Sequence, residues 1–184
     1  MKRLAIIIVA LGALLTGCKN RNAAPATETA PMVEMVEAAA PVAVPDFSVE
    51  MLDGSTVNMA SLRGKTVLLT FWATWCPPCN KEMSHVQSAV IDRFAGEEFV
   101  FLPISRGEEK ATVQKWFDEN GYKFTSGLDP DGSIFNIFAE SGIPLNILID
   151  PQGNVVERVL GYDEESHSRL TDKVAETIAA AKGE

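Results

Sequence analysis

Two cysteines separated by two prolines are the residues whose types and spacing most directly indicate chemistry. Cys76, Pro77, Pro78 and Cys79 follow a β-branched and aromatic run and precede an amphipathic helical pattern. This order predicts a dithiol at a strand-to-helix turn, where the unpaired N–H groups and the positive dipole end of the helix favour thiolate over thiol. We therefore expect Cys76 to be the nucleophile and Cys79, one helical turn further on, to be the resolving thiol.

The two prolines fit this location. The first turn of a helix tolerates proline, because the N–H group that proline lacks would have no partner there. Pro77 and Pro78 also remove two donors that would stabilise the Cys76 thiolate. The thiolate is then supported by little more than the Cys79 N–H and the helix dipole, which favours a reductant or an isomerase over a strong oxidant.

A zinc site and a structural disulfide are the alternatives for this cysteine pair. Zinc needs two further ligands, but the remaining cysteine is Cys18 near the N-terminus, and His85 and His167 have no metal-like spacing. We predict no metal site and expect both histidines at the surface. A Cys-x-x-Cys pattern beside a strand–helix–strand pattern favours redox chemistry.

The N-terminus predicts export. Lys2 and Arg3 precede an apolar run over residues 4–15, which is too short to span a bilayer comfortably, and Leu15-Thr16-Gly17-Cys18 follows. The pattern predicts a signal peptide over residues 1–17. It resembles the bacterial lipobox, which implies that Cys18 is lipidated and attaches the protein to a membrane through that lipid. An uncleaved membrane anchor is the alternative.

Composition divides the rest of the chain in two. Residues 18–45 begin with the lipidated cysteine and continue without glycine or aromatic residues, which predicts a flexible Ala/Pro-rich tether. Residues 46–184 have the length of one globular domain. The net charge of −9 argues against a nucleic-acid partner and against electrostatic attraction to anionic lipid.

The order of the predicted elements indicates the fold class. The first half of the domain shows a hairpin over 47–59, a strand over 66–72 and a helix from the cysteines to Gly96. The second half begins with a strand over 98–105. It continues with helices over 108–120 and 133–139, strands over 146–150 and 154–160, and a helix over 164–182 capped by Asp163. This order predicts an α/β fold, with a mixed sheet covered by helices on both faces.

Several motifs of this domain occur together. They are the run from Phe71 to Cys79, Lys81-Glu82-Met83, Gly142-Ile143-Pro144 before an apolar strand, Asp150, and the opening hairpin at Asp46-Phe47. Together they resemble the TlpA/ResA branch of the thioredoxin superfamily, over nearly all of residues 46–184. The resemblance implies a thioredoxin-like three-layer α/β/α fold with a central mixed sheet and an N-terminal β-hairpin.

The resemblance also implies an activity. A member of this branch would be an extracytoplasmic thiol-disulfide oxidoreductase, a disulfide reductase that acts on exported proteins and often serves cytochrome c maturation. It would be anchored on the periplasmic side of the cell envelope, at either membrane. Its partners would be protein disulfides and a membrane-bound redox protein, and it would need no cofactor beyond the dithiol.

The remaining site residues are also assigned through this resemblance. Pro144 corresponds to the cis-proline that faces the dithiol, and the alternative is an ordinary trans turn. The backbone of Ile143 would then pair with an incoming peptide as a strand does. Trp75 and Pro77, which flank the nucleophile, complete the expected substrate-binding residues.

Glu82 is the candidate base. It follows Cys79 by three residues, so one helical turn separates the two side chains. Ordinary thioredoxins bury an aspartate six residues before the nucleophile, where this chain has Thr70. Glu82 resembles the acidic residue that the ResA type uses instead, and a partly buried carboxylate there would accept the Cys79 proton. The alternative is a solvated helix glutamate.

Other functions fit the residues less well. Ser84 and Leu145 depart from the Pro and Thr usual in the family, which leaves the substrate open. A thiol peroxidase on this scaffold would need Pro and Thr or Ser where the chain has Leu69 and Ala73. A copper-binding or copper-delivery module that uses the dithiol and a histidine is the remaining alternative.

Overall fold

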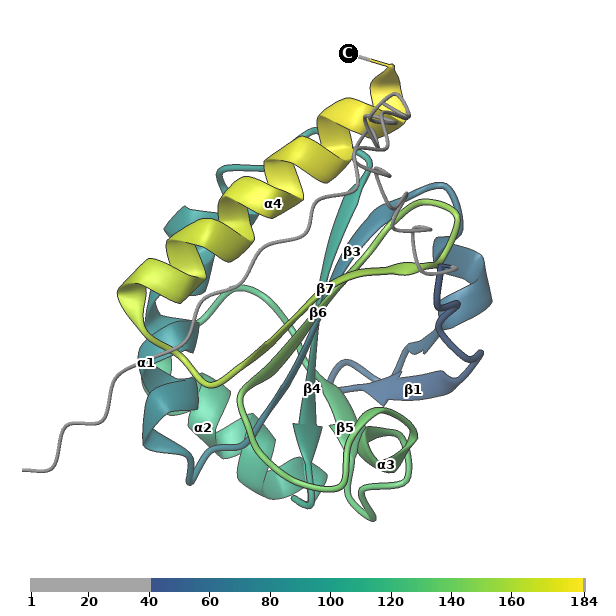
Figure 1. The fold of residues 1–184 in the computed structure, drawn as a ribbon. Coiled ribbons are helices and arrows are strands. Elements are labelled where there is room, and N and C mark those ends of the chain that lie inside the picture. Colours follow the sequence, from purple (N-terminus) through teal and green to yellow (C-terminus); the bar gives the residue numbers. More distant parts are fainter. Residues whose placement is uncertain (1–40, 184) are drawn as a thin grey trace, which may run out of the picture. The chain divides into compact units, whose positions relative to one another are not determined.

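The computed structural model describes residues 41–183, which contain one seven-stranded mixed sheet with helices on both faces (Figure 1). The strands are β1 (Ser48–Met51), β2 (Thr56–Asn58), β3 (Thr66–Trp72), β4 (Phe99–Arg106), β5 (Gly127–Asp129), β6 (Leu145–Ile149) and β7 (Val155–Leu160). The helices are α1 (Pro77–Val86), α2 (Lys110–Asn120), α3 (Phe135–Phe138) and α4 (Glu164–Lys182), with a 3-10 turn η1 (Met59–Leu62) and a π-helical turn η2 (Gln87–Ile91). The predicted α/β fold is confirmed.

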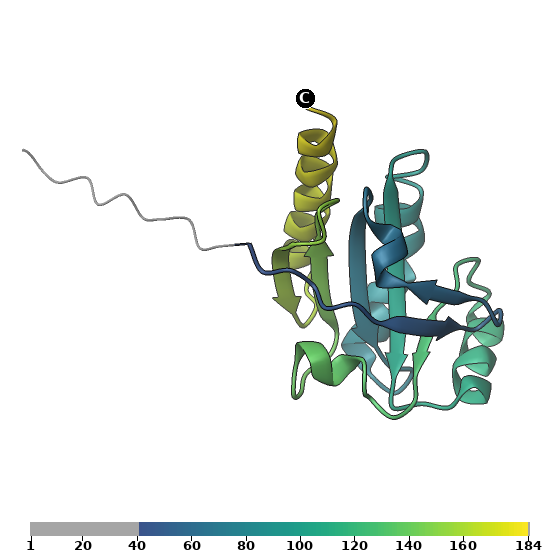
Figure 2. The same cartoon turned by 90° about the vertical axis from the view of Figure 1, so that its right-hand side faces the viewer.

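The sheet places the dithiol at the carboxyl end of a central strand. Its strand order is β2-β1-β5-β4-β3-β6-β7, so the N-terminal hairpin and β7 lie at opposite edges (Figure 2). β3 runs parallel to β4 and antiparallel to β6, and all seven of its residues are buried. A strand with neighbours on both sides and covered faces needs mostly apolar residues, and in β3 the polar exceptions are Thr66 and Thr70.

Alternate side chains of β3 enter two separate cores. Leu68 and Trp72 pack with residues of α1, α2 and α4 on one face, including Met83 and Val174. Val67, Leu69 and Phe71 belong to the core on the other face, which includes Met59 of η1 and Phe135 of α3. Thr70 has the parity of Leu68 and Trp72, so it points toward the face that α1 and α4 cover.

The helix ends follow from local sequence. Asp163 caps α4, since its carboxylate accepts from the Ser166 N–H while the Ser166 hydroxyl accepts from the Asp163 N–H, which is a capping box. The predicted bounds of this helix are confirmed. Gly121 ends α2 in the left-handed conformation that glycine adopts readily. Within residues 41–183, no helix is both long and apolar enough to cross a membrane.

The structure differs from the sequence expectation at several places. The helix expected to reach Gly96 ends at Val86 and continues as the π-helical turn η2 to Ile91. β5 was not expected, because three residues are too short to show alternation, yet this strand joins the hairpin to β4. The packed chain also begins before the boundary expected at residue 46, because Val44 is 3% exposed and Ala43 pairs with Asn154 of the β6–β7 turn. The expected signal peptide, Cys18 and most of the tether lie outside the described residues.

Candidate active site

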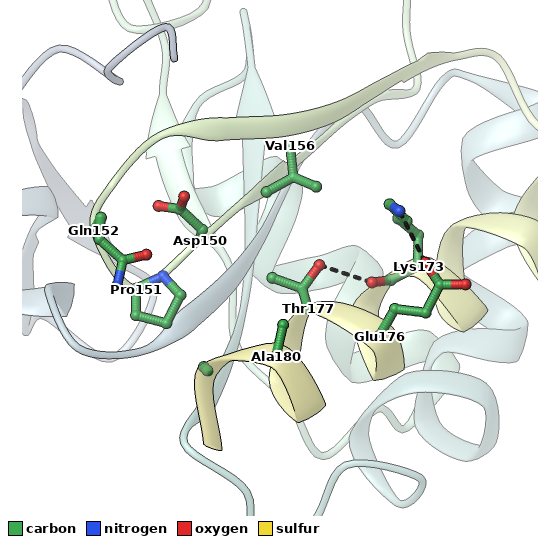
Figure 3. Close-up of a pocket in the computed structure, with 9 residues that line it drawn as sticks. Asp150, Pro151, Gln152, Val156, Lys173, Glu176, Thr177 and Ala180 are labelled. Carbon is green, nitrogen blue, oxygen red and sulfur yellow. Dashed lines mark hydrogen bonds and ion pairs between the residues drawn. The ribbon is translucent and has the colours of Figure 1, made fainter. Parts of the chain in front are cut away.

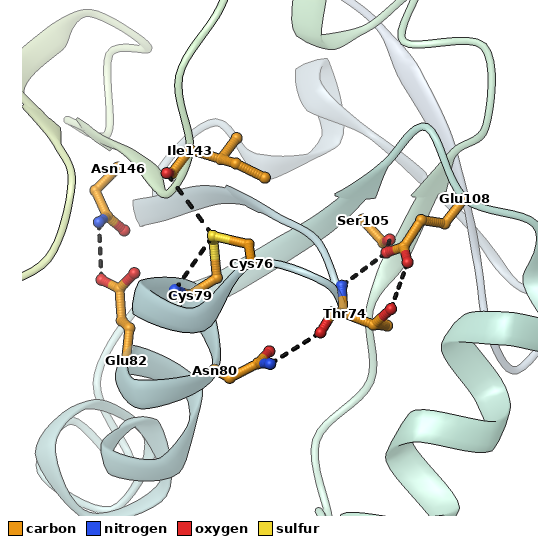
Figure 4. Close-up of a disulfide and its surroundings, with 9 residues drawn as sticks. All are labelled: Thr74, Cys76, Cys79, Asn80, Glu82, Ser105, Glu108, Ile143 and Asn146. Atoms are coloured by element: carbon orange, nitrogen blue, oxygen red, sulfur yellow. Dashed lines mark hydrogen bonds between the residues drawn. A yellow bond between two sulfur atoms is a disulfide. The ribbon is translucent and has the colours of Figure 1, made fainter.

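The two cysteines lie where β3 turns into α1 and are joined as a disulfide (Figure 4). Cys76 is the N-cap of α1, and its sulfur accepts from the Cys79 N–H at 3.3 Å. Pro77 and Pro78 occupy the first two helical positions. Cys76 is 3% exposed and Cys79 is fully buried, so the first sulfur is the one nearer to solvent in this oxidised state.

The loop before β6 faces the disulfide. The Ile143–Pro144 peptide bond is cis, as the resemblance implies, and the Ile143 carbonyl oxygen lies 3.8 Å from the Cys76 sulfur (Figure 4). Trp75, the residue before Cys76, is 65% exposed, and Pro77 is exposed as well. The structure thus brings the residues expected to bind substrate close to the disulfide, with Trp75 and Pro77 exposed, Ile143 half-buried and Pro144 buried.

A buried carboxylate holds the segment that leads into the nucleophile. Glu108, just before α2, is 8% exposed and accepts from the N–H and hydroxyl of Thr74 and from the hydroxyl of Ser105 (Figure 4). Asn80 of α1 donates to the Thr74 carbonyl at 2.8 Å. Sequence reasoning missed Glu108, since a glutamate before a helix resembles a solvated first-turn residue and its partner is 34 residues away.

Glu82 is buried, so the alternative of a solvated glutamate is wrong. It is 2% exposed on the inner face of α1, and its Oε1 accepts from the Asn146 side chain at 2.8 Å. Asn146 in turn accepts from Thr70 at 2.6 Å across the β3–β6 pair. Figure 4 shows the Glu82 carboxylate directed toward Asn146. The position at which thioredoxins bury an acid therefore holds a hydroxyl that anchors this chain of hydrogen bonds.

His167 of α4 completes this buried group, and its expected surface position is wrong. The side chain is 9% exposed, and its Nδ1 lies 3.5 Å from Glu82 Oε1. A sequence signal was present, because His167 precedes Leu170 by three residues and Val174 by seven, which places it on the apolar face of the helix. His85 is exposed, as expected, and contacts the Tyr162 hydroxyl.

The arrangement allows thiol–disulfide exchange in which the resolving thiol, Cys79, is buried. No group of three His, Cys, Asp or Glu side chains suited to a metal occurs among residues 41–183. Leu69 and Ala73, at the positions that a peroxidase would use, are fully buried apolar residues. A groove of about 500 Å³ between α4 and the β6–β7 turn contains none of the site residues (Figure 3).

Comparisons with known proteins agree with this chemistry. The AhpC/TSA family matches residues 42–158. The thiol-disulfide oxidoreductase ResA of Bacillus subtilis is 33% identical over 122 residues, which cover 66% of this chain and 68% of ResA. A Bacteroides thetaiotaomicron protein solved in solution superposes with a TM-score of 0.71 at 33% identity, covering 75% of this chain and 89% of that one. The exposed lipoprotein thioredoxin Etrx1 of Streptococcus pneumoniae superposes with a TM-score of 0.61 at 27% identity, covering 72% and 99%.

The matched region includes the disulfide and the cis-proline, because both lie within residues 42–158. The similarity to ResA and the geometry around Cys76 therefore indicate the same class of reaction. The chain belongs to the AhpC/TSA family of thioredoxin-like proteins, and it is a thiol-disulfide oxidoreductase whose redox-active pair is Cys76 and Cys79.

Proposed function

We propose that this protein is a membrane-anchored disulfide reductase of the TlpA/ResA type that acts on exported proteins, with a role in cytochrome c maturation. The observation that carries the proposal is the position of the disulfide. It lies at the N-terminus of α1, opposite the cis-proline loop and beside the exposed Trp75. An apolar side chain and a free backbone edge beside a reactive sulfur suit an extended peptide that contains a disulfide.

The reaction would proceed in two exchanges. In the reduced enzyme, the Cys76 thiolate attacks a substrate disulfide, forms a mixed disulfide and releases the first substrate thiolate. Cys79 then attacks the Cys76 sulfur, which closes the enzyme disulfide and releases the second substrate thiolate. The substrate gains two electrons, and a membrane-bound dithiol partner returns two electrons to the enzyme. The Ile143 backbone and Pro77 would hold the peptide during the first exchange.

Glu82 would act in the second exchange. Cys79 is fully buried, so bulk water cannot remove its proton, and Glu82 is the carboxylate one helical turn away from it. We assign Glu82 as the base that accepts the Cys79 proton. Its burial and its hydrogen bond from Asn146 support this role, because they fix the carboxylate on the inner face of the helix that carries the dithiol.

Anchoring would place this chemistry outside the cytoplasm. The signal pattern over residues 1–17 and the lipobox-like Cys18 support attachment by a lipid, with residues 19–40 as the main part of the tether. Etrx1, a lipoprotein by its name, has the same fold. The substrate-binding residues lie on the described domain, so a tether would let the dithiol reach exported proteins near the membrane.

A trapping experiment tests this function. The Cys79→Ser variant, expressed in its own cell envelope, should accumulate mixed disulfides through Cys76, because the second exchange is blocked. Non-reducing gels should show adduct bands that dithiothreitol removes and that the matched Cys76→Ser variant lacks. Haem-attachment apoproteins or their chaperones among the trapped proteins would support the role in cytochrome c maturation. A broad set of secreted proteins would instead indicate general reduction, and the absence of adducts in both variants would contradict the proposal.

A further inference from the structure

The buried polar side chains around Glu82 include one, His167, that Glu82 would not need if it acted as a base alone. Glu82 Oε2 and both ring nitrogens of His167 lack hydrogen-bond partners among the described residues. A buried polar atom without a partner lowers the stability of the fold. Residue 167 lies on the apolar face of α4 with Leu170 and Val174, so an apolar side chain would avoid part of this cost. Stability does not explain an imidazole here, which points to a function.

The surroundings of Glu82 restrict where its proton can go. Asn146 donates to Glu82 through an amide, which has no site that accepts a proton readily, and Thr70 behind it is 1% exposed. The proton of Glu82 therefore has no acceptor on the Asn146 side. The other near neighbour is His167, whose Nδ1 lies 3.5 Å from Oε1. The His167 side chain is 9% exposed, against 2% for Glu82, and its two ring nitrogens are themselves buried.

Imidazole is also the better acceptor of a thiol proton. An imidazole binds a proton more strongly than a carboxylate does, so moving the proton from the first to the second favours the thiolate. The transfer leaves a carboxylate beside an imidazolium, which is a favourable pair in a buried site. A carboxylate alone would return the proton to the sulfur much more often.

We propose that His167 sets the protonation of Glu82, by taking the proton that Glu82 receives from Cys79 and passing it to solvent. The inference rests on the proposed function of Glu82. In balanced form, the Cys79 thiol and neutral His167 become the Cys79 thiolate and His167 imidazolium, with Glu82 ionised before and after. The imidazolium then releases its proton to water. His167 acts through Glu82, so it is a positioning residue and not a catalytic one.

Each element that packs against His167 contributes few charged groups. α1 contributes Glu82, and the loop before α4 contributes Tyr162, whose ring centroid lies 5.3 Å from that of His167. Beyond Tyr162 lie two groups of α1, His85 at its hydroxyl and Lys81 over its ring. On β7, Glu157 faces α4 further along, toward Lys173. β3 and β6 contribute the uncharged Thr70 and Asn146.

Stopped-flow kinetics separates the two exchanges. The reduced protein is mixed with a bis(nitrobenzoate) disulfide, which releases one coloured thiolate when Cys76 attacks and a second when Cys79 closes the enzyme disulfide. We expect His167→Asn to leave the first phase unchanged within about twofold and to slow the second at least tenfold, a part of the usual contribution of acid–base groups. Imidazole added to His167→Ala should restore part of the second rate.

The pH dependence gives a second readout that loss of packing would not produce. A protonated imidazole cannot accept the proton, so the second phase of the parent protein should have a component that speeds up as pH rises. His167→Asn should lack this rise. His85→Asn is the matched control, because His85 is exposed and bonds Tyr162, and it should keep both the rate and the rise.

Three outcomes distinguish this inference from the proposed function. If Glu82→Gln slows the second phase while His167→Asn matches the parent in rate and pH profile, the role of His167 is refuted and that of Glu82 stands. If neither variant changes the second phase, Glu82 is not the base. If the parent gives no first phase, the exchange function itself fails. Circular dichroism checks the fold of each variant, and His167→Gln replaces His167→Asn if the latter does not fold.

Discussion

Removing the Glu108 carboxylate should destabilise the protein through the segment that leads into the nucleophile. The carboxylate accepts three hydrogen bonds, two from Thr74 and one from Ser105, whose side chain is fully buried. Each hydrogen bond to a charged group contributes about 1.5–3 kcal/mol, and water reaches the half-buried Thr74 more easily than Ser105. We therefore expect Glu108→Ala to lower the free energy of unfolding by about 4 kcal/mol.

The isosteric variant should cost less. In Glu108→Gln, the amide oxygen still accepts from the Thr74 N–H, and the Thr74 hydroxyl turns to accept from the new NH₂ group. Only the contribution of the negative charge to these hydrogen bonds is lost, so we expect Glu108→Gln to lower the free energy of unfolding by about 1–2 kcal/mol. This order of the two variants follows from the bonding pattern and not from the volume removed.

Urea unfolding of the oxidised protein measures both effects. With an m value of about 2 kcal/mol/M, the loss in Glu108→Ala shifts the midpoint down by roughly 2 M. Glu109→Ala is the matched control, because Glu109 is the next residue, is exposed and makes no side-chain cap bond to α2. A Glu108→Ala midpoint equal to that of Glu109→Ala would refute the reasoning.

Two further predictions concern the Asp163 cap of α4 and the proposed lipid anchor at Cys18. Ser166 donates its backbone N–H and its hydroxyl to Asp163, which holds the pKa of Asp163 below the ordinary value of 3.8. The ionised Asp163 carboxylate therefore contributes its full stabilisation above pH 3.8, and this contribution is lost as the pH falls through the lower pKa of the folded state. The difference in thermal midpoint between the parent and Asp163→Ala should then narrow below pH 3.8. A constant difference would contradict this. Cys18→Ala with a cleavable signal should release the domain to the soluble fraction, whereas a processed form that stays with the membrane would contradict the lipid anchor.

Local sequence predicts those parts of the fold whose causes are local. The strand over 66–72 follows from a run rich in β-branched and aromatic residues, and α4 follows from a cap at Asp163 and a regular apolar face. β5 does not, because it is held by pairing with β1 and β4 and has no pattern of its own. Gly127 illustrates the point, since a Cβ there would lie 2.6 Å from Val49, a contact that only the assembled sheet creates.

The site residues can also be divided into those that local sequence predicts and those that it does not. The cysteine spacing indicates the nucleophile and the helix N-terminus from sequence alone, whereas the resemblance was needed to expect the cis bond before Pro144. The contacts of Glu108 and His167 join elements 34 and 85 residues apart, to Thr74 and Glu82. Single-sequence patterns do not identify such pairs, although the position of His167 on the apolar face of α4 does indicate that it is buried.

The pairing of residues 42–44 with the β6–β7 turn has a mechanical consequence. The Val42 carbonyl accepts from Val155, the Val44 N–H donates to Gly153, and Val44 is buried. This turn lies at the amino end of β3, where Ile149 pairs with Val67, while the dithiol follows the carboxyl end, about 20 Å along the strand. A pull transmitted along the N-terminal segment is thus borne by the edge of the sheet at β7, and a protein held by this end presents its reactive sulfurs away from the point of attachment.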